Sequence, residues 1–364
     1  MKLKFYLLFI FTLSSFYSAA ALVDLTDSGY VTYGDFNSYS MPIAQIQDGC
    51  TTTGCPLFIQ SSPGHISDLI VVATGAAGNP LNTNFAGMDN AYTTPDGTSD
   101  NFFSTGIVSD PTQVGTFSGD KTTTWDSSLL ALRTFLMGDD MVFFFNNNNL
   151  NGGNEQSLAA WAQMQITGPA GGSLGIFDFT NNRGAYDLVS QGGGGTFSGD
   201  PGDYTSAGTG PHIGDNSDTD YVLSGGPICI DTHTNPGGTP IPVPCDGNED
   251  EGPINHNLGA NEAAYAIIAP ELNALIGSLF GTKTDAELAA LTLHIDLRLG
   301  CDPGFGGAGD ENCTGLASGF GKNINNGYEQ MFIGTATKAN GIPVPEPGIL
   351  LIFLTGLLYL RLRR

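Results

Sequence analysis

The feature that most constrains the fold is a run of nine residues, 291–299, in which apolar and polar side chains alternate. The apolar positions are Leu291, Leu293, Ile295, Leu297 and Leu299, and the polar positions between them are Thr292, His294, Asp296 and Arg298. Because successive side chains of a strand point to opposite faces, the pattern predicts a β-strand with one buried face and one solvated, salt-bridging face. The alternative is that His294, Asp296 and Arg298 form a ligand-binding triad.

The rest of the chain favours a mainly β fold. Its 51 glycines and 20 prolines indicate many turns and few long helices. Short apolar runs between turn residues predict strands at residues 69–72, 141–145, 157–166, 174–180 and 328–336, although the Ala-rich segment 157–166 also fits a helix. Together these features predict a β-sandwich of jelly-roll or lectin-like type, in one large or two smaller domains.

A few short helices are also expected. Residues 125–137 predict a helix in which Asp126 is the N-cap and Gly138 ends the helix. Residues 259–279 predict a second helix, interrupted or kinked by Pro270. The sequence Thr-Asp-Ala-Glu at 284–287 is a capping box that opens a third.

The charge of the chain excludes one class of partner and suggests a cofactor. The formal net charge is −24, and proteins that bind nucleic acid need patches of Lys and Arg to neutralise phosphate, so nucleic acid is not an expected partner. Residues 215–220 and 246–251 have the composition of calcium loops, although neither fits the EF-hand spacing. We name Asp246, Asn248 and Asp250 as candidate calcium ligands, with solvated acidic loops as the alternative.

Six cysteines lie in three local pairs, and each pair brackets a loop rich in turn residues. The pairs are Cys50 and Cys55, Cys229 and Cys245, and Cys301 and Cys313. Six cysteines allow fifteen connectivities, and we predict the local pairing, formed in an oxidising compartment. Metal binding is the weaker alternative because the chain has no Cys-x-x-Cys pair.

Catalytic motifs are weak. Residues 171–175 match the G-x-S-x-G pattern of hydrolases, but a strand rather than a helix is predicted after Ser173, so a glycine-rich turn is the better interpretation. His256 is a candidate base or ligand that lacks a second spaced histidine. Trp125, Trp161 and Tyr186 are candidates for stacking on sugar rings, with burial in the core as the alternative.

One hexapeptide, Gly-Thr-Phe-Ser-Gly-Asp, occurs twice. The copies are residues 115–120 and 195–200. They mark either two related strand–turn units or a coincidence in a chain rich in Gly, Ser and Thr.

Both ends of the sequence predict export. Lys2 and Lys4 precede a mainly apolar stretch, and small residues at 18–21 suit signal peptidase, so residues 1–21 are predicted to be a cleaved signal peptide. An uncleaved anchor is the alternative. The acidic body then covers residues 22–338.

The C-terminal tail is the most specific signal. A Pro-rich spacer at 339–347, which includes Val344, Pro345, Glu346 and Pro347, precedes an apolar segment at 348–360 and a basic end at 361–364. The apolar segment predicts a short transmembrane helix, and Arg361, Arg363 and Arg364 would hold the C-terminus in the cytoplasm. A plain membrane anchor and a core helix are the alternatives.

This tail resembles the PEP-CTERM sorting signal, by which exosortases process surface proteins of Gram-negative bacteria that make exopolysaccharide. The resemblance implies an inner-membrane intermediate and cleavage by an exosortase within residues 344–347. The expected function is that of a non-enzymatic cell-surface or extracellular-matrix protein, with a role beside exopolysaccharide or in biofilm. A glycan-binding or glycan-degrading protein, or a purely structural adhesin, is the alternative.

Overall fold

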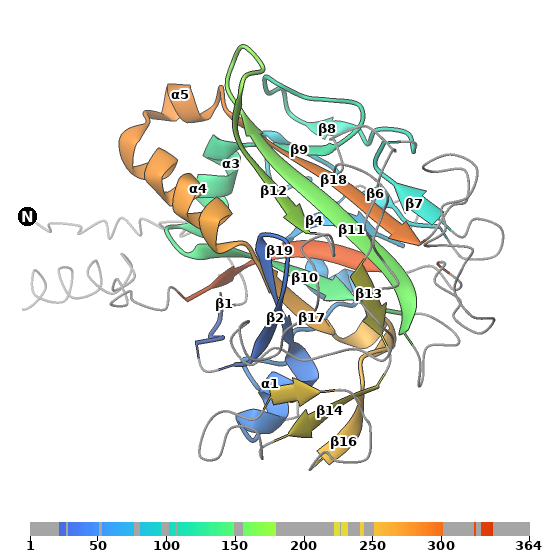
Figure 1. Ribbon diagram of the computed structural model, residues 1–364. Helices are drawn as coiled ribbons and strands as arrows, with labels where there is room; N and C mark the ends of the chain where they lie inside the picture. The colour runs from blue at the N-terminus through green and yellow to red at the C-terminus, as the bar shows by residue number, and fades with distance from the viewer. Residues whose placement is uncertain are drawn as a thin grey trace, which may run out of the picture.

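The computed structural model describes residues 22–26, 28–50, 53–75, 81–95, 102–106, 108–148, 156–179, 222–225, 227–231, 241–243, 251–300, 324 and 329–337. Within these ranges the chain is mainly β, with two eight-stranded sheets, a three-stranded sheet and short helices (Figure 1). The predicted signal peptide, spacer, transmembrane segment and basic end all lie outside them. No helix among the described residues is long and apolar enough to cross a membrane.

The first sheet brings together strands from both ends of the body. Its order is β2 (Tyr30–Tyr33), β3 (Phe36–Ser40), β17 (Tyr265–Ile268), β10 (Asp140–Asn146), β19 (Gln330–Ala336), β4 (Ile70–Thr74) and β6 (Tyr92–Thr93), and β1 (Leu22–Val23) also pairs with β19. The predicted strands at 69–72, 141–145 and 328–336 are therefore confirmed as β4, β10 and β19.

The second sheet carries the longest strands. Its order is β12 (Ser173–Phe179), β11 (Gln156–Thr167), β18 (Thr292–Gly300), β9 (Trp125–Ser128), β5 (Met88–Asp89) and β8 (Gln113–Val114), with β13 (Val222–Gly225) paired to β11 and β7 (Phe102–Ser104) paired to β18. The three-stranded sheet is β15 (Ile241–Val243), β14 (Pro227–Asp231) and β16 (Glu251–Asn255). The prediction of a strand rather than a helix near 157–166 is confirmed.

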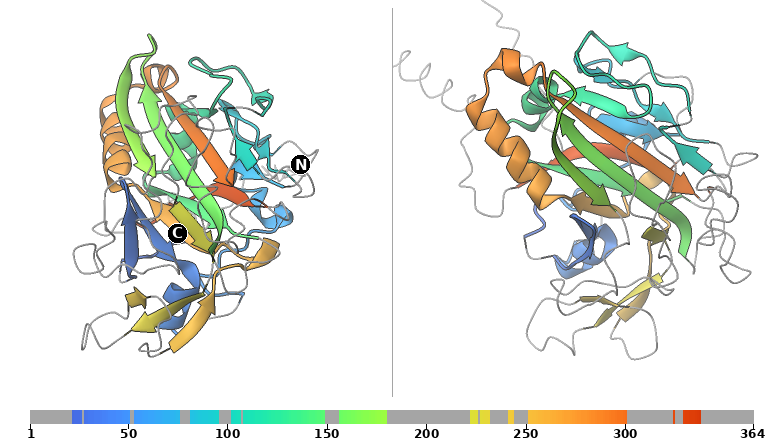
Figure 2. Two further views of the ribbon diagram at one scale, coloured as in Figure 1. Left: turned by 45° about the vertical axis from the view of Figure 1, so that its right-hand side comes forward. Right: turned by 45° about the horizontal axis from the view of Figure 1, so that its top comes forward.

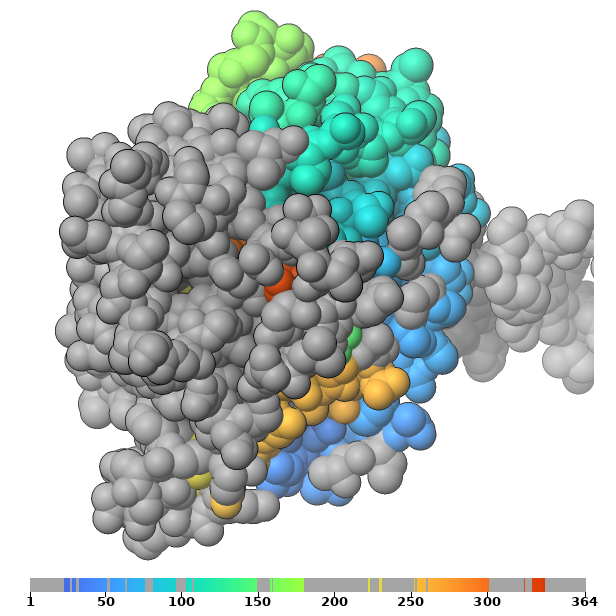
Figure 3. Space-filling view, turned by 90° about the vertical axis from the view of Figure 1, so that its right-hand side faces the viewer, coloured from blue at the N-terminus to red at the C-terminus, as the bar shows by residue number. Residues whose placement is uncertain are grey.

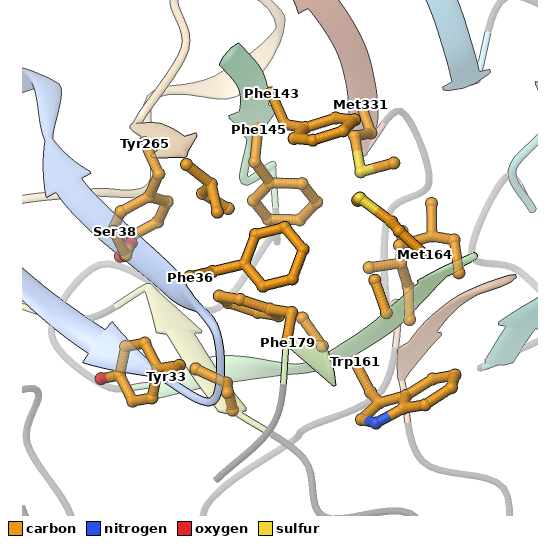
Figure 4. A pocket seen from close by; sticks show the side chains of 16 residues that line it. Tyr33, Phe36, Ser38, Phe143, Phe145, Trp161, Met164, Phe179, Tyr265 and Met331 are labelled. Atoms are coloured by element: carbon orange, nitrogen blue, oxygen red, sulfur yellow. The ribbon is translucent and has the colours of Figure 1, made fainter. Parts of the chain in front are cut away.

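The two large sheets pack on one another and share an apolar core (Figure 2). Phe179 of β12 meets Phe36 of β3 edge to face at 5.9 Å between ring centroids, and Tyr33 of β2 at 5.7 Å. A cavity of 40 Å³ remains between the sheets, lined by side chains from both (Figure 4). Ligand pockets usually measure roughly 300–1,000 Å³, so this cavity is a packing gap and not a binding site.

The central strands of the first sheet, β10, β19 and β4, are buried on both faces. Phe143 and Phe145 of β10 point into the shared core, whereas Val142 and Phe144 join a second apolar cluster on the other face. Helix α1 (Met41–Gln47) and helix α2 (Pro63–Ile66) contribute to that second cluster. This burial explains why β10 reads as a continuous apolar run and not as an alternating one.

The predicted helix at 125–137 begins four residues later than expected. Residues 125–128 form β9, and α3 (Leu129–Leu136) begins when the Ser128 side chain accepts a hydrogen bond from the Ala131 amide at 3.3 Å. Asp126 is therefore not the N-cap but a buried residue of β9. The helix ends at Met137, whose φ of 50° is left-handed, directly before Gly138.

The predicted helix at 259–279 is wrong in its first half. Residues Gly259–Asn261 form a 3₁₀ turn, β17 follows, and α4 (Pro270–Thr282) begins at Pro270. Proline lacks an amide hydrogen, so it suits the first turn of a helix, where that hydrogen would have no partner. The capping box at Thr284 is confirmed and opens α5 (Asp285–Leu288).

The predicted wet face of residues 291–299 is also wrong. Strand β18 forms, but every residue in it is buried. The loop residues around it cover the polar face: Thr105 Oγ1 donates to Asp296 Oδ1 at 3.1 Å, and Thr292 Oγ1 donates to the Ser118 carbonyl at 2.6 Å. The strand therefore has an apolar face in the shared core and a buried polar face under Thr105 and residues of the segment 108–124.

One predicted disulfide is confirmed. Cys50 and Cys55 are bonded, with Cα atoms 5.7 Å apart. Cys229 is disulfide-bonded as well. Cys245, Cys301 and Cys313 lie outside the described residues.

Candidate metal centre

Three aspartates meet on the polar side of the second sheet. Asp89 lies in β5, Asp126 lies in the adjacent β9, and Asp120 lies in the loop that precedes β9. One carboxylate oxygen from each lies within 4.8 Å of one from each of the others. Asp89 and Asp126 are fully buried and Asp120 is half-buried. Residues 108–124, which carry Asp120, form part of the surface at the top of Figure 3.

Asp126 is fixed by a set of hydrogen bonds. Its Oδ1 accepts from Thr124 Oγ1 at 2.6 Å, and its Oδ2 accepts from the Lys121 amide at 2.5 Å. His294, directly opposite in β18, places Nδ1 at 2.7 Å from Oδ1 and Nε2 at 2.8 Å from Thr167 Oγ1. When Asp126 is ionised, Nδ1 donates to it and Nε2 accepts from the threonine, so neither ring nitrogen is available as a metal ligand.

Only one carboxylate oxygen of Asp89 has a hydrogen-bond partner. Its Oδ2 accepts from the Asp126 amide at 2.7 Å, whereas its buried Oδ1 has no hydrogen-bond partner. The buried Oδ1 of Asp120 has none either. Buried polar atoms in proteins almost always have a partner, so two such oxygens in one cluster are unusual.

The electrostatics of the cluster follow from burial. Burial, together with the charges of Asp126, Asp120 and Asp110, raises the pKa of Asp89 to about 9, against the effect of its backbone hydrogen bond. Burial also raises the pKa of Asp126, against the effect of its hydrogen bonds. The pKa of His294 is lowered to about 3, mainly by burial, so this histidine is neutral. Carboxylates held in this way retain protons near neutral pH unless a cation neutralises them.

This donor set suits a hard cation. Three carboxylate oxygens are the ligands that calcium and magnesium prefer, and no thiolate or available imidazole joins them among the described residues. The sequence-predicted ligands Asp246, Asn248 and Asp250 lie outside the described residues, as do residues 215–220. The three aspartates here were not predicted, because no spacing motif links positions 89, 120 and 126. Only the hexapeptide at 115–120 touches the site, since Asp120 is its last residue.

The predicted triad on β18 is brought together but not exposed. His294, Asp296 and Arg298 are fully buried. Arg298 pairs with Asp296 at 3.0 Å, while His294 faces Asp126. A solvent-facing ligand triad is therefore excluded.

His256 also belongs to the interior. Its Nε2 lies 2.5 Å from Ser40 Oγ, its Nδ1 lies 3.0 Å from the Ile254 carbonyl, and its ring stacks on Tyr265 at 5.3 Å between centroids. Glu262 accepts a hydrogen bond from Gln45. The histidine is fully buried, which argues against a role as a catalytic base in an open cleft.

The structure describes three of the remaining candidate residues, and none of the three forms a functional site. Ser173 begins β12 after a turn in which the Gly168 amide bonds to the Gly172 carbonyl at 2.9 Å, so the glycine-turn interpretation is confirmed. Trp125 and Trp161 are fully buried and cannot stack on a sugar at the surface. Tyr186 and the second hexapeptide lie outside the described residues.

A groove of 640 Å³ adjoins the segments that lead into the aspartates. It lies between α3, residues 84–87 and residues 115–117, and Phe85, Phe117 and Phe135 line it as half-buried side chains. Asn84, Thr116 and Thr134 add polar groups to the lining.

Comparison with known proteins gives a family but no function. A family model described as a domain of unknown function, DUF8239, matches residues 22–298. The chain belongs to this family. The DUF8239 match includes all three aspartates of the candidate metal centre. Neither a curated protein nor a solved structure matches the chain.

Proposed function

We propose that the protein is exported and acts without catalysis at the cell surface or in the extracellular matrix of a Gram-negative bacterium. Signal peptidase removes residues 1–21, and residues 348–360 hold the chain briefly in the inner membrane. An exosortase then recognises Pro345, Glu346 and Pro347 and releases the body. The resemblance of the tail to PEP-CTERM signals is the main support for this proposal.

The Cys50–Cys55 disulfide is the structural observation that supports export. Disulfides persist in oxidising compartments such as the periplasm and the cell exterior. The family match begins at residue 22, where the mature chain is expected to start. A net charge of −24 is also in keeping with a soluble protein outside the cell.

Intact mass of the protein recovered from the native cell surface or medium tests the proposal. The expected mass runs from residue 21 or 22 to a residue near Pro345–Pro347. A triple variant, Pro345→Ala, Glu346→Ala and Pro347→Ala, keeps the apolar segment and should retain Arg364 in the membrane fraction. The exposed Glu271→Ala is the control and should be processed normally. A wild-type mass that still includes Arg364 would make the tail an ordinary anchor.

We also propose that the body is a β-sandwich of jelly-roll or lectin-like type. Two large sheets with a shared core are arranged as in a β-sandwich, and most neighbouring strands are antiparallel. Both features support a jelly-roll or lectin-like topology. An experimental structure in which the two sheets share no core would contradict it.

A glycan-binding function is the second candidate, and the groove beside α3 supports it. Phe85 and Phe135 meet edge to face at 5.5 Å, and Phe117 and polar side chains complete the lining. Aromatic faces beside hydroxyl and amide groups suit a sugar ring. Calorimetric titration with oligosaccharides should show binding that Phe117→Ala weakens, whereas the exposed Leu174→Ala does not. Release of reducing sugar would indicate a hydrolase, and no binding would remove this candidate.

A further inference from the structure

We propose that Asp89, Asp120 and Asp126 bind one divalent cation, calcium in preference to magnesium. The site is distinct from the acidic loop at 246–250. The observations that support the cation site do not involve the sorting tail, so this proposal is tested separately from the proposed function.

The separation of the carboxylate oxygens fits a common cation. Calcium binds oxygen at about 2.3–2.6 Å, so two of its ligands are at most roughly 5.2 Å apart. The three aspartate oxygens lie within 4.8 Å of one another and meet this condition without movement.

The unpartnered oxygens indicate that the cluster is built for a ligand. Asp89 is fully buried, and its Oδ1 has no partner, as is true of the buried Oδ1 of Asp120. Leaving a buried polar group unsatisfied is unfavourable, and a cation bonded to both oxygens would remove that penalty. The other oxygen of Asp89 and both oxygens of Asp126 already accept hydrogen bonds, which hold the two side chains in place.

Among the described residues, no Lys or Arg side chain forms an ion pair with the three aspartates. The Lys121 ammonium donates to Gln165 Oε1 at 3.1 Å, while only the backbone amide of Lys121 bonds to Asp126. His294 orients Asp126 through the contact between its Nδ1 and Asp126 Oδ1. The Lys121 ammonium therefore lies near the cluster without forming an ion pair with any of its three carboxylates.

The preference for calcium follows from the rigidity of the site. Magnesium demands near-ideal octahedral geometry and gives up its water reluctantly, so a site with fixed carboxylates suits it less. Asp89 and Asp126 are held by hydrogen bonds to buried groups of β9 and β18, which fix the positions of their carboxylates. Calcium accepts longer bonds and an irregular ligand set.

Thermal unfolding of the full chain, stripped with chelator, tests the proposal. Adding calcium chloride at 100 times the dissociation constant should raise Tm by about 5 °C. Magnesium chloride at the same concentration should raise it less. Asp89→Asn should remain folded, with a Tm in chelator close to that of the wild type because a neutral amide of the same shape replaces the carboxyl group, and should show no calcium response.

Two further variants locate the site. Asp120→Asn removes the least buried ligand and should weaken calcium binding at least tenfold, whereas the exposed Asp68→Asn should bind as the wild type does. Asp246→Asn tests the sequence-predicted loop and should leave the response unchanged. The proposal would be overturned if calcium did not change the Tm of the wild type. It would also be overturned if the calcium response were lost in Asp246→Asn but kept in Asp89→Asn and Asp120→Asn.

Terbium luminescence gives a local readout. Trp125 precedes Asp126 directly, so excitation of the indole should sensitise terbium bound at the three aspartates. The emission should be displaced by calcium, and it should be lost in Asp120→Asn and reduced in Trp125→Phe. Sensitised emission that survives Asp120→Asn at full strength would place terbium elsewhere and contradict the assignment.

Discussion

The guanidinium carbon of Arg298 lies 4.5 Å from the ring centroid of Trp161, and both side chains are fully buried. The two residues are direct neighbours across β18 and β11. Arg298 also pairs with Asp296 at 3.0 Å. A cation is thus enclosed between an aromatic face and a carboxylate on the polar side of the second sheet.

Replacing Arg298 with Met should destabilise the fold strongly. The change leaves Asp296 buried without its ion-pair partner, and removing one member of a buried pair costs about 3–5 kcal/mol. Urea unfolding monitored by circular dichroism measures the loss. Arg133→Met is the matched control because Arg133 pairs with the exposed Asp285, and such pairs contribute about 0–1 kcal/mol. Equal losses in the two variants would contradict the prediction.

A side chain at Gly119 should destabilise the fold. Its φ is +89°, and an added Cβ would lie 2.5 Å from Thr292 Oγ1. Gly138, with φ of +103° and no atom within 4 Å of where a Cβ would lie, is the matched control for backbone strain alone. Gly138→Ala should cost about 1–2 kcal/mol, and Gly119→Ala should cost about 1–3 kcal/mol more because of the overlap. Urea unfolding of both variants measures the difference, and equal losses would show that Thr292 moves aside.

Glu329 should make stability fall as pH rises. The residue is fully buried, both its carboxylate oxygens lack a hydrogen-bond partner, and burial raises its pKa from 4.5 to about 8. Between these values the unfolded chain has lost the proton that the folded chain keeps, so the free energy of unfolding decreases with pH, on the order of 1.4 kcal/mol per pH unit. Above pH 8 both states are ionised and this contribution is constant.

The variant Glu329→Gln isolates this effect. It should be more stable than the wild type at pH 8 and should lose less stability between pH 5 and pH 8. Asp89 and Asp126 change stability in the same direction, so the prediction concerns the difference between the two proteins. Urea unfolding at several pH values in chelator measures it, and parallel pH profiles would contradict it.

The Cys50–Cys55 disulfide should add modestly to stability. It joins residues separated by 5 positions, and closing so short a loop in the unfolded chain is worth about 2 kcal/mol. The double variant Cys50→Ala, Cys55→Ala should therefore lose about that amount of unfolding free energy, measured in urea without reductant. Because the variant lacks the Cys50–Cys55 bond, dithiothreitol cannot destabilise it by reducing that bond. A variant as stable as the wild type would show that the bond contributes little.

Local sequence patterns predicted strands and helices better than they predicted the tertiary contacts of those strands and helices. The alternation at 291–299 predicts the strand, but the burial of its polar face depends on Thr105 and residues of the segment 108–124, which lie far away in the sequence. Pro270 was assigned to a helix interior because the apolar residues before it look helical, whereas those residues form β17. Ser128, and not Asp126, caps α3 because Asp126 is engaged in the sheet.

The candidate metal centre could not be predicted from sequence patterns, because it too depends on contacts between segments that are distant in the sequence. Asp89, Asp120 and Asp126 meet only because β5 pairs with β9 and the loop before β9 folds back over the sheet. In a chain with 36 acidic residues, nothing local distinguishes these three. The sequence patterns favoured concentrated acidic loops, whereas the structure assembles its ligands from separate segments.

The pairing of β1 with β19 has a mechanical consequence. The two strands are parallel, with Leu22 beside Thr335, so both ends of the body leave from one edge. A pull on the tail enters β19 along its own direction. Seven residue pairs with β10 would then resist together in shear, and not open one after another. A surface protein tethered through this strand would transmit tension into the centre of its first sheet before any peripheral strand was loaded.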